Sequence, residues 1–192
     1  MTHEVLMLII GAAISLVSSV VTLIIQKAIN QWGKLRIFYQ RIPSRFSNHK
    51  NWGIQTDAEG ELVFEVPMYI QFQNISDNAR IIRDFGLYAF LGDKEIIKFT
   101  QAECIEHKDK NGISRKVFGN SEGYSFSIKP KNIEQYLLEF ILIERDVPSE
   151  FDNLRIVYYD TNNKKQVFKL CSIEKGWAER EYESDRDWIE LK

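Results

Sequence analysis

The chain has 192 residues, a formal net charge of −2, 44% hydrophobic residues and 27% charged residues. This composition excludes a disordered chain, and the length predicts one domain with short appendages. The averages hide a segregated sequence, because residues 5–25 contain no charged side chain at all.

Charge is segregated as well. Residues 51–192 hold 26 of the 27 acids but only 19 of the 25 bases, so this part of the chain is acidic. The other six bases follow the uncharged run with no acid among them: Lys27, Lys34, Arg36, Arg41, Arg45 and Lys50. No basic stripe able to neutralise several phosphates is visible in the acidic part, so we expect no nucleic-acid partner.

The uncharged run predicts one transmembrane helix near the N-terminus. Its 21 residues would span about 31 Å as an α-helix, which matches the hydrocarbon thickness of a bilayer. A cleaved signal peptide is the alternative, but it requires a basic start, a shorter apolar stretch and small residues before the cleavage site. Here the chain begins Met-Thr-His-Glu, and the bulky Ile24 and Ile25 precede Gln26. We therefore predict a short tail over residues 1–4 and an anchor with an interfacial extension over residues 5–32.

The bases after the run predict the orientation of the anchor. Lys and Arg are enriched on the cytoplasmic side of membrane helices, which places the N-terminus outside and the C-terminal domain in the cytoplasm. We expect four residues to lie at the membrane interface, where bases and aromatic rings contact headgroups: Lys27, Trp32, Lys34 and Arg36. Gly33 is a suitable end for the helix.

Small residues recur on one face of the predicted helix. Gly11, Ser15 and Ser19 are four positions apart and therefore stack, which allows two membrane helices to approach closely. This pattern predicts a homo-oligomer formed through helix–helix contact. Two alternatives remain: a monomeric anchor tolerates the same residues, and a polar face can line a pore.

Alternation of apolar and polar residues dominates from residue 34 to residue 173. It predicts strands near residues 35–39, 61–73, 81–91, 95–100, 114–118, 124–128, 135–143, 154–159 and 166–173, joined by turns rich in Asn, Asp, Gly and Pro. Such a series predicts a mainly β domain, an antiparallel β-sandwich, with an immunoglobulin-like arrangement as first choice and a small barrel as second. No Trp lies between Cys104 and Cys171, so the match is to an architecture and not to a family.

Two features of this segment stand out. Residues 42–60 are polar and long for a loop, so they form either a functional loop or structure that the pattern does not reveal. Pro67 cannot donate a hydrogen bond to a neighbouring strand, which predicts an edge position or a bulge.

Residues 174–192 differ from the rest in lacking alternation. They hold seven acids, four bases and good helix formers, which predicts a short helix or a tail packed on the domain. Trp177, Tyr182 and Trp188 in this segment would be suitable anchors for a protein partner, because Trp and Tyr are favoured in interfaces.

The residue types that carry chemistry give no catalytic constellation. Cys104 and His107 form a lone Cys-x-x-His, and zinc requires more ligands than this. The two cysteines either pair or stay reduced in the core. Acidic pairs such as Asp185 with Asp187 are interpreted as solvated surface, and Asn74-Ile75-Ser76 as a turn and not as a glycosylation site. We expect no catalytic residue, metal or cofactor.

Three functions remain open at this point. The first is a single-pass, membrane-anchored interaction module that binds a protein at the cytoplasmic face of the lipid bilayer. The second is a membrane effector or sensor whose clustered anchors perturb the bilayer. The third, an enzyme acting at the membrane, has no sequence motif in its favour.

Overall fold

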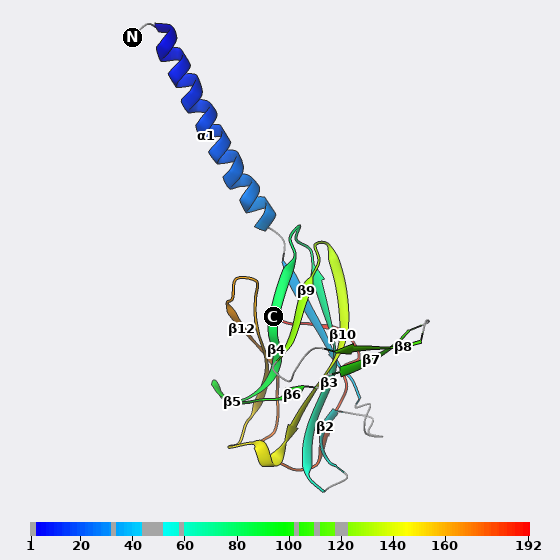
Figure 1. Ribbon diagram of the computed structural model, residues 1–192. Helices are drawn as coiled ribbons and strands as arrows, with labels where there is room; N and C mark the ends of the chain where they lie inside the picture. Colours follow the sequence, from blue (N-terminus) through cyan, green and yellow to red (C-terminus); the bar gives the residue numbers. More distant parts are fainter. Residues whose placement is uncertain are drawn as a thin grey trace.

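The computed structural model describes residues 3–31, 34–43, 52–57, 60–101, 104–109, 112–117 and 123–192, and shows one N-terminal helix followed by a mainly β domain with two antiparallel sheets (Figure 1). In these residues the elements are α1 (His3–Gln31), β1 (Leu35–Arg41), β2 (Trp52–Thr56), β3 (Leu62–Asn74), β4 (Arg80–Leu91), β5 (Lys94–Lys98), β6 (Thr100–Gln101), β7 (Cys104–Asp109), β8 (Gly112–Val117), β9 (Tyr124–Ile128), β10 (Asn132–Ile143), the 3-10 turn η1 (Glu144–Asp146), β11 (Asn153–Tyr159), β12 (Lys165–Ser172), β13 (Arg180–Tyr182) and β14 (Ile189–Glu190).

Helix α1 contains the predicted anchor. Its segment Met7–Gln26 is long and apolar enough to cross a membrane, and none of that segment is buried within the protein. The helix leads away from the β domain, as Figure 1 shows. The prediction of one apolar helix near the N-terminus is therefore confirmed.

The first sheet is organised around β3. Strand β10 pairs with its full length on one side, from Asn132 opposite Asn74 to Ile143 opposite Val63. On the other side, β1 pairs with the second half of β3 and β2 with the first half. Strands β1 and β2 therefore act as one strand that is interrupted between residues 42 and 52. The predicted polar loop thus contains β2, which the sequence pattern did not reveal.

The interruption lies next to Pro67, in the middle of β3. The backbone N–H of Ile42 donates to the carbonyl of Pro67 at 3.0 Å, so the backbone polar groups of Pro67 face the β1–β2 side. The missing N–H of the proline therefore points at the break, where no ladder partner is required. The prediction of an edge position was wrong, because β3 is central and its neighbour is interrupted instead.

The C-terminal segment completes the outer edge of this sheet. It contains no helix: β13 pairs with β2, and β14 pairs with β1. The tail thus runs beside both halves of the interrupted strand and extends the sheet by one row.

The second sheet has the order β12-β11-β4, and β4 carries two partners on its far side. Strand β9 pairs with the first half of β4 and β5 with the second half. Strands β7 and β8 form a separate hairpin, in which Cys104 is opposite Val117 and His107 is opposite Ser114.

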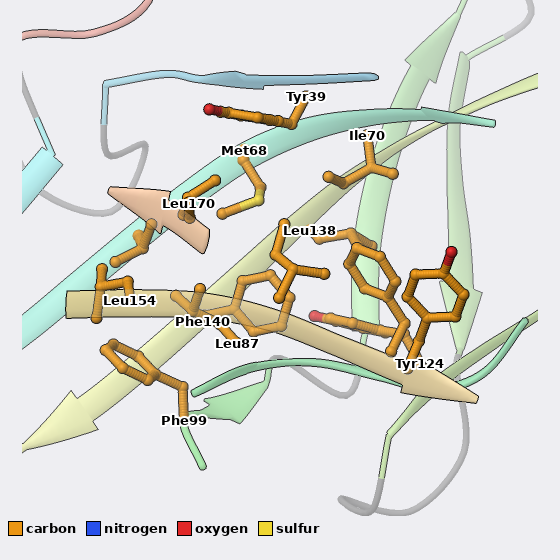
Figure 2. Packing of buried hydrophobic residues seen from close by; sticks show 14 of the residues in the cluster. Tyr39, Met68, Ile70, Leu87, Phe99, Tyr124, Leu138, Phe140, Leu154 and Leu170 are labelled. Atoms are coloured by element: carbon orange, nitrogen blue, oxygen red, sulfur yellow. The ribbon is translucent and has the colours of Figure 1, made fainter. Parts of the chain in front are cut away.

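Side chains of both sheets share one core. Figure 2 shows Tyr39, Met68 and Ile70 of the first sheet close to Leu87, Leu154 and Leu170 of the second. Many core residues are aromatic, and their rings stack or meet edge to face, such as Phe72 with Phe85 at 5.7 Å between centroids. None of the residues of this core belongs to α1, so the domain has a core of its own. Each large apolar side chain that is fully buried stabilises the fold by about 1.5–3 kcal/mol.

Candidate functional site

Three turns and the start of β1 meet at the end of the domain that α1 enters (Figure 1). We call them the helix-side loops: Lys34, residues 75–80, residues 129–131 and residues 160–164. Hydrogen bonds join them to one another. The N–H of Ile75 donates to Lys34 O at 3.3 Å, the N–H of Lys131 to Ser76 O at 3.2 Å, and the N–H of Ile81 to the Thr161 hydroxyl at 3.0 Å.

A buried amide fixes this arrangement. The side-chain N–H₂ of Asn74 donates to the carbonyls of Asn78, Ile128 and Lys129 at 2.8–3.2 Å. Its oxygen accepts from both the N–H and the hydroxyl of Ser76. Because Asn74 is only 1% exposed, its nitrogen is inaccessible to a glycosylating enzyme in the folded domain, which agrees with the interpretation of Asn74-Ile75-Ser76 as a turn.

A cavity of about 250 Å³ opens between these loops. Its walls are formed by Lys34, Leu35, Arg80, Ile81, Tyr158, Asp160, Thr161, Asn162 and Gln166. Partial burial alone would raise the pKa of the Asp160 carboxyl, but donation from the N–H groups of Lys164 and Asn162 and from Gln166 lowers it. Asp160 is therefore an anion whose hydrogen-bonding capacity is largely used by the turn itself.

Charge differs between the two ends of the domain. The helix-side loops hold five bases and two acids: Lys34, Arg80, Lys129, Lys131 and Lys164 against Asp77 and Asp160. In the described loops at the opposite end, residues 57, 60–61, 92–94, 144–152 and 174–176, eight acids stand against three bases. Acids therefore outnumber bases in the described loops opposite to α1, whereas bases outnumber acids in the helix-side loops.

Apolar side chains also lie exposed among the helix-side bases. Ile75, Ile81 and Ile133 are 42%, 50% and 54% exposed. Single exposed apolar residues are common on protein surfaces, so these isoleucines gain a meaning only together with the bases of the helix-side loops.

A second surface lies on the outer side of the first sheet. Phe38, Tyr69 and Leu137 point away from the core and are half-buried, and the exposed Trp188 lies beside Tyr69 with 6.4 Å between ring centroids. We call these four residues the aromatic face. The guanidinium of Arg36 lies 4.9 Å from the centre of the Phe38 ring at its border.

The residues predicted at the membrane interface divide into two groups. Lys34 is exposed among the helix-side loops, whereas Arg36 belongs to β1 and forms a two-point ion pair with Glu190 at 2.7 and 3.1 Å. This pair raises the pKa of Arg36 and lowers the pKa of Glu190. Trp32 and the side chain of Lys27 lie outside the described residues.

The residues predicted to bind a partner also have different environments. Trp177 packs edge to face on Phe151 at 5.9 Å, and Tyr182 stacks on Trp52 at 4.6 Å, so both contribute to packing of the tail. Only Trp188 is substantially exposed, at 37%.

On the small-residue face of α1, the Ser19 hydroxyl has its hydrogen-bond partner within the helix. The Ser19 hydroxyl donates to the Ser15 carbonyl at 2.9 Å, and the Cβ direction of Gly11 is open. The hydroxyl therefore needs no second helix for its hydrogen bond, and association through Gly11, Ser15 and Ser19 stays a prediction that rests on close backbone packing.

Sequence reasoning missed a buried ion pair at the interruption between β1 and β2. The guanidinium of Arg41 binds the carboxylate of Asp185 at 2.5 and 2.8 Å, and the backbone N–H of Arg41 donates to the same carboxylate at 2.7 Å. The two side chains are 15% and 10% exposed, so the interpretation of Asp185 as solvated surface was wrong. No local pattern signals a pair that is 144 positions apart.

Cys171 lies near this pair as a free thiol. Burial raises its pKa to about 11, although the neighbouring Arg41 acts in the opposite direction. The thiol is therefore protonated and unreactive at neutral pH.

The described residues contain no group of three His, Cys, Asp or Glu side chains that could hold a metal ion. Comparison with protein-family models and with curated proteins finds no match for this chain. The side chains of Cys104 and His107 lie outside the described residues.

Proposed function

We propose that this chain is a single-pass membrane-anchored interaction module that presents a β-sandwich to a protein partner at the cytoplasmic face of the membrane. One observation carries the proposal: the apolar segment Met7–Gln26 is wholly exposed, while the β domain buries a core of its own. An exposed 20-residue helical segment that is mostly apolar and uncharged is unfavourable in water, so a bilayer is the environment that fits α1.

The aromatic face is the surface we assign to the partner. Trp, Tyr and Phe are enriched in interfaces because they bury a large area with few rotatable bonds. Trp188 and Tyr69 lie together on the outer side of the first sheet, away from the core, and Trp188 is 37% exposed.

Orientation and detailed architecture are part of the same proposal. The bases that follow α1 support a cytoplasmic domain. Two antiparallel sheets over one core support a sandwich, with an immunoglobulin-like arrangement first and a small barrel second. Protease digestion of sealed vesicles tests the orientation, since a cytoplasmic domain is protected in right-side-out vesicles and cleaved in inverted ones.

Quantitative proximity labelling with the full chain tests the partner face. Trp188→Ala combined with Tyr69→Ala should remove a specific set of labelled proteins that the wild type enriches. Val167→Ala is the matched control, because Val167 is a 43% exposed apolar residue on the second sheet. Equal labelling by the wild type and the double variant would exclude the aromatic face as the binding surface.

A further inference from the structure

We infer that the helix-side loops dock onto anionic lipid headgroups of the bilayer that α1 spans. The inference rests on anchoring by α1 and goes beyond it, since it assigns a lipid-binding surface to the β domain itself. In this arrangement the end of the domain that carries the helix-side loops faces the membrane, and the aromatic face does not.

The first step is reach. Residues 27–31 extend α1 by about 8 Å beyond the apolar segment, and the steps from Gln31 to Lys34 add at most about 11 Å. Lys34 therefore lies within about 19 Å of the hydrocarbon edge. Headgroups occupy roughly 6 Å of this distance and electrostatic attraction extends about 8 Å further, so the tether is short enough for the loops to reach the headgroup layer.

The second step is charge. Basic residues near an anionic leaflet are attracted individually and their effects add. The two acids among the helix-side loops offset this attraction only in part. Asp77 forms an ion pair with Lys131 at 3.2 Å, both more than half exposed. Asp160 accepts two hydrogen bonds within its own turn and one from Gln166 of β12. Exposed pairs of this kind are weak, so Lys131 can exchange its partner for a phosphate.

The third step is the combination of charge with apolar tips. Ile75 and Ile133 are exposed, and the Lys131 ammonium donates to the Ile75 carbonyl at 2.9 Å, which matches a surface whose bases meet phosphates while short apolar groups enter the headgroup–acyl boundary. The buried Asn74 holds these loops together, so the surface is formed before it meets the lipid. Asp160 on the cavity wall disfavours a multiply charged anion there, and for this reason we assign docking to the loops as a set and not to the cavity.

The experiment uses the full chain reconstituted into vesicles of phosphatidylcholine alone or mixed with phosphatidylglycerol. A photoreactive amino acid replaces Ile133, and lipid adducts are quantified by mass spectrometry. The same substitution at Glu150, an exposed position at the opposite end of the domain, gives the background. Lys129→Glu with Lys164→Glu tests the charge, and Lys94→Glu with Lys175→Glu changes net charge equally at the opposite end.

We expect abundant adducts at position 133 in the anionic vesicles, several-fold fewer in neutral vesicles and background yield at position 150. The Lys129/Lys164 variant should lower the docking equilibrium constant about 30-fold and so reduce the adducts at position 133. The Lys94/Lys175 variant should give the adduct yield of the wild type. Equal yields in both lipid mixtures, equal yields at positions 133 and 150, or equal effects of the two charge variants would each overturn the inference. Failure of the anchor is a separate result, because the protein would then not sediment with the vesicles at all.

Discussion

The ion pair of Arg41 and Asp185 gives the most direct test of how the C-terminal tail is held. In Asp185→Asn the guanidinium of Arg41 loses its counter-ion in a site where its side chain is only 15% exposed. Removing one partner of a buried pair costs about 3–5 kcal/mol, and the residual exposure here places the expected loss of unfolding free energy at about 3 kcal/mol. For a chain of this size the loss corresponds to a Tm lower by about 6–12 °C.

Urea unfolding of the full chain in detergent, followed by tryptophan fluorescence, measures this loss. Trp52 is a suitable reporter because the Arg41 guanidinium lies 5.0 Å from the centre of its ring. Glu174→Gln is the matched control: it removes the partner of Arg180 in a pair whose carboxylate is 78% exposed, and it should cost less than about 1 kcal/mol. If Asp185→Asn costs no more than Glu174→Gln, the pair does not hold the tail.

A second variant separates charge burial from packing. Arg41→Met combined with Asp185→Leu removes both charges and should recover part of the loss seen in Asp185→Asn, because no uncompensated charge is left. A double variant as unstable as the single one would show that the hydrogen bonds, and not the buried charge, determine the effect.

Three further outcomes are expected. With a pKa of about 11, Cys171 is thiolate to only about 0.1% at pH 8, so alkylation followed by peptide mapping should be slow in the native protein and fast in denaturant; equal rates would contradict its burial. Asn74→Ala leaves buried carbonyls without donors and should lower unfolding stability by about 2–3 kcal/mol, whereas Asn162→Ala on an exposed turn should have little effect in the same urea titration. Ser15→Leu should reduce crosslinked dimer in membranes if α1 associates through its small-residue face, while Val17→Leu on the opposite face leaves the yield unchanged; the absence of a dimer in the wild type would end that hypothesis.

The parts of the fold that the sequence predicted are those with a local signal. The apolar run of α1 and the alternation in β3, β4 and β10 are properties of consecutive residues, and the structure confirms one apolar helix and a mainly β domain with two antiparallel sheets. Strand β2 has only five residues and includes Gly53, so its own pattern is weak. It is a strand because it continues β1 along the free edge of β3.

In the C-terminal segment a local signal is present but predicts the wrong element. Good helix formers between residues 174 and 192 favour a helix locally, but pairing with β2 and β1 satisfies backbone groups of both partners and overrides that preference. The clustering of bases on the helix-side loops was also invisible in the sequence, because Lys34, Lys129 and Lys164 come together only through the order of the strands.

The tail that closes the first sheet also sets an order of events during synthesis. The N–H of Leu191 donates to the carbonyl of Ile37 at 2.8 Å, so the first strand of the domain receives its outer neighbour from residues made about 150 positions later. At roughly 5–20 residues per second this interval is about 8–30 s. During that time β1 follows α1 with an open backbone edge, and an open strand edge is a template on which another chain can pair.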